Sequence, residues 1–218
     1  MMRGAFVILA MMWCAVGAME QSRQFGQYEL PKECRQVVVV SPKDGGYAMS
    51  LVEYDGEESN IEYFAPCSVG YRGIAAYGTK REGDGKTPEG MFALRRGLCF
   101  TMDFESRFPM EQYDQNDIWS EDPESPDYNT LVRDPLPENQ GERLWARRET
   151  QFRYIVVVEY NTNPIVAGAG SAIFIHAWRN EGRPTAGCIG MAEENVRQLV
   201  EWLDPDKNPH IIILDEQH

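Results

Sequence analysis

Two short runs of branched apolar residues constrain the fold of this chain most. Residues 155–158 read Ile-Val-Val-Val and residues 211–214 read Ile-Ile-Ile-Leu, with no polar position in either run. Runs this short and this rich in β-branched residues favour strands over helices. Because no face of them is polar, both runs predict strands that lie at the centre of a sheet and are covered on both sides.

A third run, at residues 36–40, is followed by strand patterns at 47–54 and 60–69. The turn sequences Lys43-Asp-Gly-Gly46 and Asp55-Gly56 separate them. Short strands joined by such glycine-containing turns pair with their chain neighbours, so this part predicts an antiparallel meander. Further strands are expected at residues 91–95, 152–160, 171–176 and 210–214.

One helix is expected, at residues 191–203. Val196, Leu199, Val200 and Leu203 recur at helical spacing, and Asp204-Pro205 follows as a stop signal. Together these elements predict a mainly β (α+β) fold with one long helix.

The regular pattern is interrupted between residues 97 and 149. Prolines recur there among acids and aromatics, and no period of a strand or a helix persists. The aromatic residues favour packing over disorder, and a long irregular segment in a compact domain usually has a function. We therefore expect 97–149 to be an ordered, lid-like insertion over the site.

The N-terminus resembles an export signal. A short positive start is followed by an apolar stretch, and small residues precede Ala18. We expect residues 1–18 to be a signal peptide, 19–35 an N-terminal segment and 36–218 the catalytic domain. A lipoprotein anchor on Cys14 is the alternative. Export implies a periplasmic or cell-wall location, with no transmembrane span after cleavage.

Four cysteines remain after cleavage: Cys34, Cys67, Cys99 and Cys188. In an oxidising compartment an even number suggests disulfides. If Cys188 is a nucleophile it must stay reduced, and the other three then allow one bridge whose partners the sequence does not identify. No metal-binding spacing of cysteine and histidine is present, so we expect neither a metal nor a cofactor.

The net charge of −13 excludes a duplex nucleic acid as a probable partner, since such binding depends on basic side chains. Basic residues nevertheless gather locally. Lys80, Arg81 and Lys86 share one loop, Arg143, Arg147 and Arg148 a second, and Arg179 and Arg183 lie near the motif described next. Carboxylates on a substrate would find partners there, although ordinary surface ion pairs explain single arginines equally well.

The candidate chemistry lies in His176, at the end of an apolar strand, and Cys188, within Thr185-Ala-Gly-Cys-Ile-Gly190. A thiol becomes a strong nucleophile beside an imidazole or at the positive end of a helix. Gly187 allows a sharp turn, so the amides of residues 186–188 are candidates for oxyanion stabilisation. Both residue types also have structural uses, and a buried core pair is the alternative.

Two separated motifs resemble the L,D-transpeptidase catalytic domain family (YkuD-like). Lys86-Thr-Pro-Glu-Gly-Met-Phe92 is similar to the family's Thr-Pro-x-Gly-x-Phe, and Phe174-Ile-His176 leads to Thr185-Ala-Gly-Cys-Ile189. A subgroup with Lys-Arg-Glu-Gly-Asp-Gly, Asp-Pro-x-x-Pro-x-Tyr-Asn and Pro-Thr-x-Gly-Cys matches more closely, with Asp122-Pro-Glu-Ser-Pro-Asp-Tyr-Asn129 here. The resemblance runs from about Cys67 to Leu214.

The resemblance implies a β-sandwich or barrel catalytic domain that acts on peptidoglycan stem peptides. Cys188 would attack the bond after the diamino acid at position three, with His176 as base and the Ala177 carbonyl orienting its ring. A thioester would form, and its acyl group would pass to an amine. Substrate contacts are expected from Thr185, Tyr128 and Asn129.

Two positions depart from most of the family, which has a histidine before Gly-Cys and an arginine two residues after the cysteine. Ala186 and Gly190 stand there. We therefore expect Arg179 or Arg81 to bind the substrate carboxylate.

Rival functions are a hydrolase, as an L,D-carboxypeptidase or endopeptidase using the same pair, and a non-catalytic wall-binding protein. The sequence leaves the acyl acceptor, the protonation state of the pair and the oligomeric state open.

Overall fold

The structure is a computed structural model, and it describes residues 23–55, 58–133 and 141–215. The predicted signal peptide lies outside these residues. The described residues up to Lys32 belong to a unit separate from the rest of the chain. Within it, β1 (Gln24–Phe25) pairs antiparallel with β2 (Tyr28–Glu29).

The larger unit, Glu33–His218, is built on one sheet of nine strands. Its path runs β15-β14-β13-β8-β16-β3-β4-β5, with β9 paired to β8 beside that path. Its strands are β3 (Gln36–Lys43), β4 (Gly46–Asp55), β5 (Glu58–Cys67), β8 (Gly90–Cys99), β9 (Met110–Gln112), β13 (Tyr154–Val158), β14 (Phe174–Ala177), β15 (Ile189–Met191) and β16 (His210–Ile213). β3 and β16 pair in parallel, as do β14 and β15 and also β8 and β9. The mainly β prediction is confirmed.

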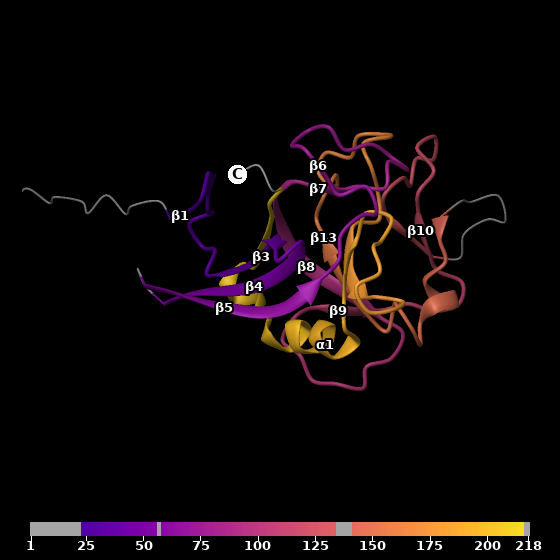
Figure 1. The fold of residues 1–218 in the computed structure, drawn as a ribbon. Coiled ribbons are helices and arrows are strands. Elements are labelled where there is room, and N and C mark those ends of the chain that lie inside the picture. The colour runs from indigo at the N-terminus through magenta and orange to yellow at the C-terminus, as the bar shows by residue number, and fades with distance from the viewer. Residues whose placement is uncertain (1–22, 56–57, 134–140, 216–218) are drawn as a thin grey trace, which may run out of the picture. The chain divides into compact units, whose positions relative to one another are not determined.

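The two ends of this sheet meet, so that it forms a nearly closed barrel (Figure 1). Ser68, just after β5, makes an antiparallel bridge to Gly190 in β15. A Cβ atom on residue 190 would lie 2.7 Å from the Ser68 hydroxyl oxygen. Glycine therefore permits the close approach that joins the first and last strands of the path.

The predicted meander is present as β3, β4 and β5. Asp44 and Gly45 form a two-residue turn with φ values of 52° and 79°, and Lys43 pairs with Gly46 across it. A tight hairpin requires such positive φ angles, and an Asp-Gly sequence supplies them. The second predicted turn includes Gly56, which lies outside the described residues.

The two branched apolar runs occupy central strands, as predicted. β13 lies between β14 and β8, and β16 lies between β8 and β3. Side chains of β13 alternate: Val156 and Val158 belong to one buried cluster, and Ile155 and Val157 belong to another. Because successive residues of a strand point to opposite faces, both faces of β13 are covered.

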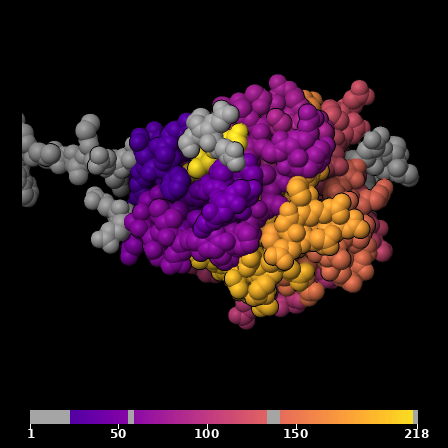
Figure 2. All heavy atoms as spheres, viewed as in Figure 1, coloured from indigo at the N-terminus to yellow at the C-terminus, as the bar shows by residue number. Residues whose placement is uncertain are grey.

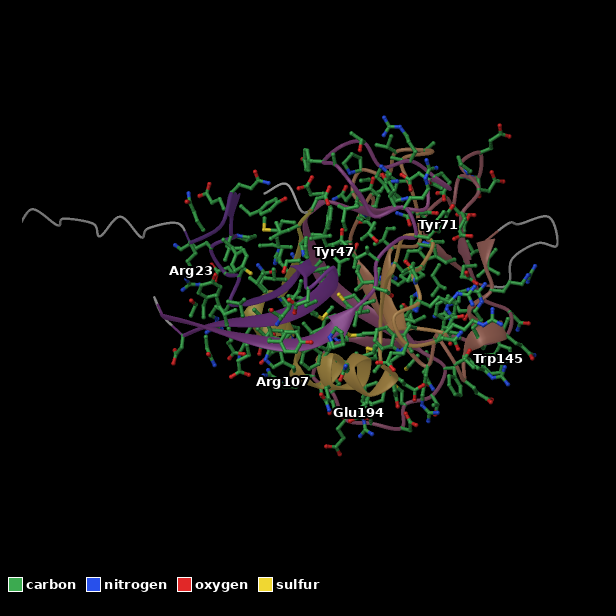
Figure 3. The ribbon with its side chains drawn as sticks, in the orientation of Figure 1. Arg23, Tyr47, Tyr71, Arg107, Trp145 and Glu194 are labelled. Carbon is green, nitrogen blue, oxygen red and sulfur yellow. The ribbon has the colours of Figure 1, made fainter. Side chains whose placement is uncertain are left out.

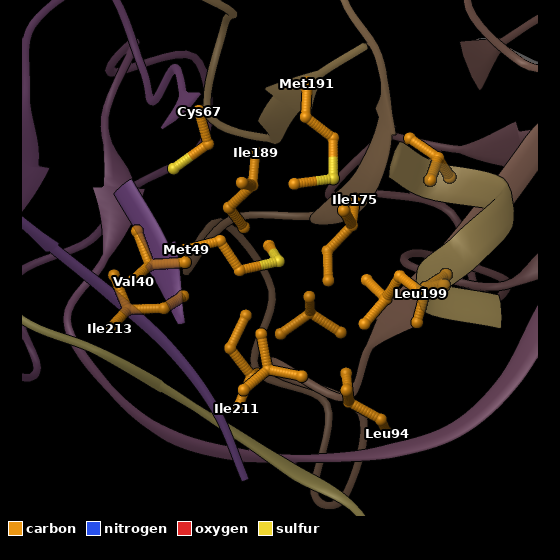
Figure 4. Packing of buried hydrophobic residues seen from close by; sticks show 14 of the residues in the cluster. Val40, Met49, Cys67, Leu94, Ile175, Ile189, Met191, Leu199, Ile211 and Ile213 are labelled. Atoms are coloured by element: carbon orange, nitrogen blue, oxygen red, sulfur yellow. The ribbon is translucent and has the colours of Figure 1, made fainter. Parts of the chain in front are cut away.

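The helix α1 (Glu193–Trp202) covers the first of these faces. Figure 4 shows Leu199 of α1 close to Ile175 of β14 and near Ile211 of β16, with Met49 of β4 on the far side of the same cluster. The outer side of the helix is polar, and Glu194 projects away from the sheet (Figure 3).

The helix begins two residues later than predicted, because Ile189–Met191 forms strand β15. Ala192, with extended backbone angles, is its N-cap, and Leu203 ends it. The short 3₁₀ helix η2 (Pro205–Lys207) then leads to β16. Periodicity predicted the helix itself, but a three-residue strand that depends on pairing with β14 leaves no periodic signal.

The insertion is ordered where the structure describes it. Besides β9, which pairs with β8, its elements are β10 (Ile118–Ser120), β11 (Leu131–Val132), β12 (Gly141–Glu142) and the 3₁₀ helix η1 (Leu144–Arg147). β10 pairs with both β11 and β12. Four of its aromatic side chains are buried: Phe108, Tyr113, Trp119 and Tyr128. Strand β8 continues to Cys99, so the irregular part starts slightly later than residue 97.

The insertion packs on the second face of β13 and β14. Trp119 meets Phe174 edge to face, with ring centroids 4.9 Å apart. Tyr113, Trp119 and Leu144 share a buried cluster with Ile155 and Phe174. The same face of β14 therefore contacts the insertion, while the other contacts α1.

All four described cysteines are free thiols. The single bridge that the sequence allows among Cys34, Cys67 and Cys99 is not formed. Cys67 ends β5 beside Tyr47, whereas Cys99 ends β8 beside Tyr154, so they belong to separate strand pairs.

Candidate active site

A cavity of about 750 Å³ opens on the face of β14 that the insertion covers. His176 and Cys188 both line it. Residues from the loop between β6 (Ile74–Ala75) and β7 (Thr87–Pro88), from the insertion and from the segment before β15 complete its wall. Residues 70–71, just before β6, lie beside the segment before β15 at the surface (Figure 2), since Gly70 bridges to Thr185 and the Tyr71 amide bonds to the Thr185 carbonyl.

His176 is fixed within β14 and points to the cavity side with Phe174. Its Nδ1 atom lies 2.7 Å from the Ala177 carbonyl oxygen, and its ring stands edge to face against Phe152 at 5.1 Å. A carbonyl only accepts hydrogen bonds, so Nδ1 carries the proton and Nε2 keeps its lone pair. Burial lowers the pKa of His176 to about 4, and the ring is therefore neutral at pH 7.

Cys188 donates a hydrogen bond from Sγ to the Ala172 carbonyl at 3.1 Å. Burial, together with the charges of Glu142 and Glu121, raises the pKa of this thiol to about 12, although the Phe174 backbone amide lowers it. Both pKa shifts favour a neutral thiol and a neutral imidazole at rest, which is one of the two forms that the sequence left open.

Cys188 does not lie at the N-terminus of a helix. Cys188 lies on a loop that leads into β15, and α1 begins only at Glu193. Since the effect of a helix dipole is confined to its first turn, α1 contributes little to the thiolate.

Two threonines hold the backbone around Cys188. The Thr185 hydroxyl donates to the Cys188 carbonyl at 2.6 Å and accepts from the Gly187 amide at 3.1 Å. The Thr87 hydroxyl, fully buried, donates to the Gly187 carbonyl at 2.7 Å and accepts from the Gly70 amide at 2.9 Å. The Thr-Pro motif thus supports the nucleophile loop, a role that the sequence analysis missed although it had identified the motif.

Gly187 has φ +156°, and a Cβ atom there would lie 3.0 Å from the Lys86 carbonyl oxygen. Glycine therefore lets the loop pass close to the loop before β7. The Gly187 amide is bonded to Thr185, so it is not free to stabilise an oxyanion in this conformation. Of the three predicted amides, this leaves those of Ala186 and Cys188 as candidates.

Of the two arginines expected at the carboxylate, Arg179 lines the cavity and Arg81 does not. The Arg81 guanidinium instead donates to the carbonyls of Gly78 and Lys80, within its own loop. Arg183 also lines the cavity. Neither Arg179 nor Arg183 forms an ion pair within the described residues, so both are available to a bound anion.

Tyr128 and Asn129 are buried behind the wall instead of forming it. The Tyr128 hydroxyl donates to Glu82 and accepts from the Gly170 amide at 3.0 Å. Asn129 bonds to the Ala172 amide at 3.0 Å. Both residues support the segment that leads into β14, whereas substrate contact was predicted.

The sequence analysis also missed three carboxylates on the cavity wall: Glu82, Glu121 and Glu142. Glu142 pairs with Arg147 at 3.1 Å, and Glu82 accepts from Ser171 at 2.7 Å. Burial, with Glu142 and Glu82 nearby, raises the pKa of Glu121 to about 7. Glu82 lies within the Lys-Arg-Glu-Gly-Asp-Gly motif, whereas no motif marks Glu121 and Glu142, which lie in the irregular insertion. Among the described residues no cluster of three potential metal ligands occurs.

The departure at Gly190 has a steric reason. A Cβ atom on residue 190 would lie 2.7 Å from the Ser68 hydroxyl oxygen, within the bridge that closes the barrel, so a larger residue there requires the Ser68 side chain to move. The basic residues that line the cavity are Lys80, Arg147, Arg179 and Arg183, of which Arg179 and Arg183 are exposed.

The nearly closed barrel thus brings a histidine and a cysteine to one cavity. Residues 35–212 match the L,D-transpeptidase catalytic domain (YkuD) family, and the chain belongs to this family. The predicted resemblance is thereby confirmed, and the family links the protein to peptidoglycan. No curated protein matches the chain. Within the described residues, no helix is long and apolar enough to span a membrane.

Proposed function

We propose that this protein is a cysteine L,D-transpeptidase that acts on tetrapeptide stems of peptidoglycan. Sγ of Cys188 attacks the carbonyl carbon between the residue at position three and the D-alanine at position four. His176 Nε2 takes the thiol proton and passes it to the departing D-alanine amine. The thioester then reacts with an acceptor amine, whose proton returns through His176 to leave a 3→3 cross-link or an exchanged D-amino acid.

The observation that carries this proposal is the shared cavity of His176 and Cys188 in a domain of this family. The Ala177 carbonyl fixes the tautomer that leaves Nε2 free to accept a proton. Because both groups rest in their neutral forms, proton transfer accompanies the attack on the substrate. Burial of the pair strengthens each electrostatic interaction at the reacting atoms.

The charge of the cavity wall fits a diamino acid substrate. Arg179 and Arg183 are suited to bind a carboxylate, and Glu82, Glu121 and Glu142 are suited to bind an ammonium group. A diamino acid that keeps one amino group and one carboxylate outside the peptide chain carries both of these groups. An acceptor amine must lose a proton before it attacks, and Glu121, with its pKa of about 7, is a suitable proton acceptor.

We also propose that the protein works outside the cytoplasm, in the periplasm or against the cell wall. The positive start, apolar stretch and small residues before Ala18 support this, since peptidoglycan lies there. N-terminal sequencing of the mature protein tests it, and retained Met1 would contradict it.

Intact-protein mass spectrometry tests the chemistry. Incubation with a carbapenem should add the mass of the whole opened ring to one cysteine, and incubation with a tetrapeptide muropeptide should add the donor without its D-alanine. Both adducts should vanish in Cys188→Ala. Cys67→Ala is the matched control, because this buried thiol lies in the apolar core and should leave both adducts intact.

Hydrolysis is the second candidate, since a carboxyl group with a pKa near neutrality can also activate water. The two reactions share the thioester and differ in its fate. Muropeptide analysis with and without an added D-amino acid separates them: exchange or cross-linked products indicate transfer, and tripeptide alone indicates hydrolysis. The absence of any Cys188 adduct would instead favour the non-catalytic wall-binding protein.

A further inference from the structure

The residue that accepts the Cys188 hydrogen bond has an unusual backbone conformation. Ala172 has φ +52°, in the left-handed region that L-residues other than Asn and Asp rarely adopt. Its side chain is buried, and its carbonyl accepts from Cys188 Sγ at 3.1 Å. Such a conformation persists only where the surrounding structure holds it, and it often occurs at functional sites.

The group that holds it is the Asn129 side chain. Asn129 Oδ1 accepts from the Ala172 amide at 3.0 Å and from Trp119 Nε1 at 3.0 Å. Asn129 Nδ2 donates to the carbonyls of Tyr160 at 3.1 Å and Asn161 at 2.8 Å. All four hydrogen-bonding positions of the amide are therefore used, which fixes its orientation. Asn129 is 3% exposed and itself adopts φ +59°.

We propose that Asn129 is a positioning residue for the nucleophile. By binding the Ala172 amide, it keeps Ala172 in the left-handed conformation and so aims the Ala172 carbonyl at the Cys188 thiol. The thiol is then held in one orientation in the resting enzyme until a substrate arrives. This inference rests on the proposed role of Cys188 as the nucleophile, and its tests use no peptidoglycan substrate.

The effect on ionisation follows from the hydrogen bond. A carbonyl that accepts from S–H stabilises the neutral thiol and raises its pKa, while the Phe174 amide favours the thiolate. The charged or titratable groups around Cys188 are His176 in β14, Glu121 and Glu142 in the insertion, and Lys80 in its loop. None of these bonds to Asn129 or Ala172, so an Asn129 variant changes the carbonyl without removing a charge.

Infrared spectroscopy of the S–H stretch tests the proposal directly. The Cys188 band, assigned by subtracting the spectrum of Cys188→Ala, should lie at the lower frequency of a hydrogen-bonded thiol. In Asn129→Ala it should move to the frequency of a free thiol. A free-thiol band in the wild-type protein would overturn the proposal.

The pH profile of Cys188 alkylation by iodoacetamide supplies a second readout, because only the thiolate displaces iodide. In Asn129→Ala the midpoint should fall by on the order of one pH unit. Asn161→Ala is the matched control: Asn161 also has a positive φ and bonds to the Gly170 carbonyl, but it does not bind the Ala172 amide. Its S–H band and midpoint should equal those of the wild type. Equal shifts in both variants would indicate general loosening and overturn the proposal.

If Asn129→Ala does not fold, Ala172→Val replaces it. A β-branched residue strongly disfavours a positive φ, so the carbonyl should turn away although Asn129 is intact. The same shifts of the band and midpoint are expected. An unchanged band in folded Ala172→Val, or in folded Asn129→Ala, would contradict the proposed positioning.

Discussion

Ile175 and His176 are neighbours in β14, yet their side chains meet different surroundings. Ile175 belongs to the apolar cluster that α1 covers, while His176 lines the cavity with residues of the insertion. The period of two along a strand separates them. One face of the same strand therefore stabilises the barrel, and the other presents the proposed base.

The two faces also differ in how they are covered. α1 and the strands opposite it present apolar side chains, and packing alone specifies that side. The insertion places Glu121, Glu142 and Arg147 beside the reacting groups, so polar contacts decide the structure there. An irregular cover can bring charged residues into a cavity, whereas a regular amphipathic helix brings an apolar stripe.

The largest effects should come from replacing His176 and Ile175 with alanine, one at a time. His176→Ala should lower kcat by about 10²- to 10⁴-fold, because the proposed general base is lost. Ile175→Ala should cost about 2–5 kcal/mol of unfolding free energy through the cavity that it leaves. Turnover of a muropeptide donor and urea unfolding measure the two effects. If Ile175→Ala remained as stable as the wild type, or His176→Ala remained fully active, the division between the faces would be wrong.

The second largest effect should be on the pH dependence of the free energy of unfolding. The folded-state pKa of His176 is about 4 against an ordinary value of 6.5, so the unfolded chain takes up a proton first as the pH falls. The free energy of unfolding that this pKa difference provides is fully present above pH 6.5 and is lost between pH 6.5 and 4. It amounts to about 3 kcal/mol. His176→Gln should therefore lose less stability than the wild type between pH 7 and 4 in urea unfolding. His210, whose pKa burial also lowers, should still contribute in that variant. Equal losses in both proteins would show that His176 is not buried in its neutral form.

The smallest effect should come from Arg179, an exposed residue that lines the cavity. Arg179→Ala should raise KM for a carboxylate-bearing donor several-fold and leave kcat near its wild-type value, since an exposed ion pair is worth about 1 kcal/mol or less. Arg197→Ala is a suitable control, because Arg197 pairs with Glu201 on the outer side of α1, away from the cavity. Should both variants behave alike, Arg183 alone would remain as the carboxylate partner.

The sequence predicted the regular elements better than the cavity wall. The central strands, the meander and α1 follow from runs and periods that tertiary contacts reinforce. β15 and the late start of α1 were missed because a three-residue strand exists only through its pairing with β14. His176 and Cys188 were found from their motifs, whereas Glu121 and Glu142 lie in a segment without a pattern.

Substrate contacts were predicted less well, for a similar reason. Arg81 and Tyr128 lie within motifs, but a short loop can turn a side chain toward the cavity or back onto its own carbonyls. Arg81 turns back, and Tyr128 lies behind the wall. Proximity along the chain therefore identified the right loops without identifying which side chains face the cavity.

The sequence by itself determined that this chain forms a mainly β domain and identified a histidine and a cysteine as the candidates for its chemistry, because both follow from local patterns and residue types. Only the tertiary structure decided that the pair rests in its neutral form, that Thr87 supports the nucleophile loop and that Ala172 accepts the thiol's hydrogen bond. These properties depend on burial and on contacts between residues far apart in the chain. Burial and long-range hydrogen bonds arise only when the barrel closes.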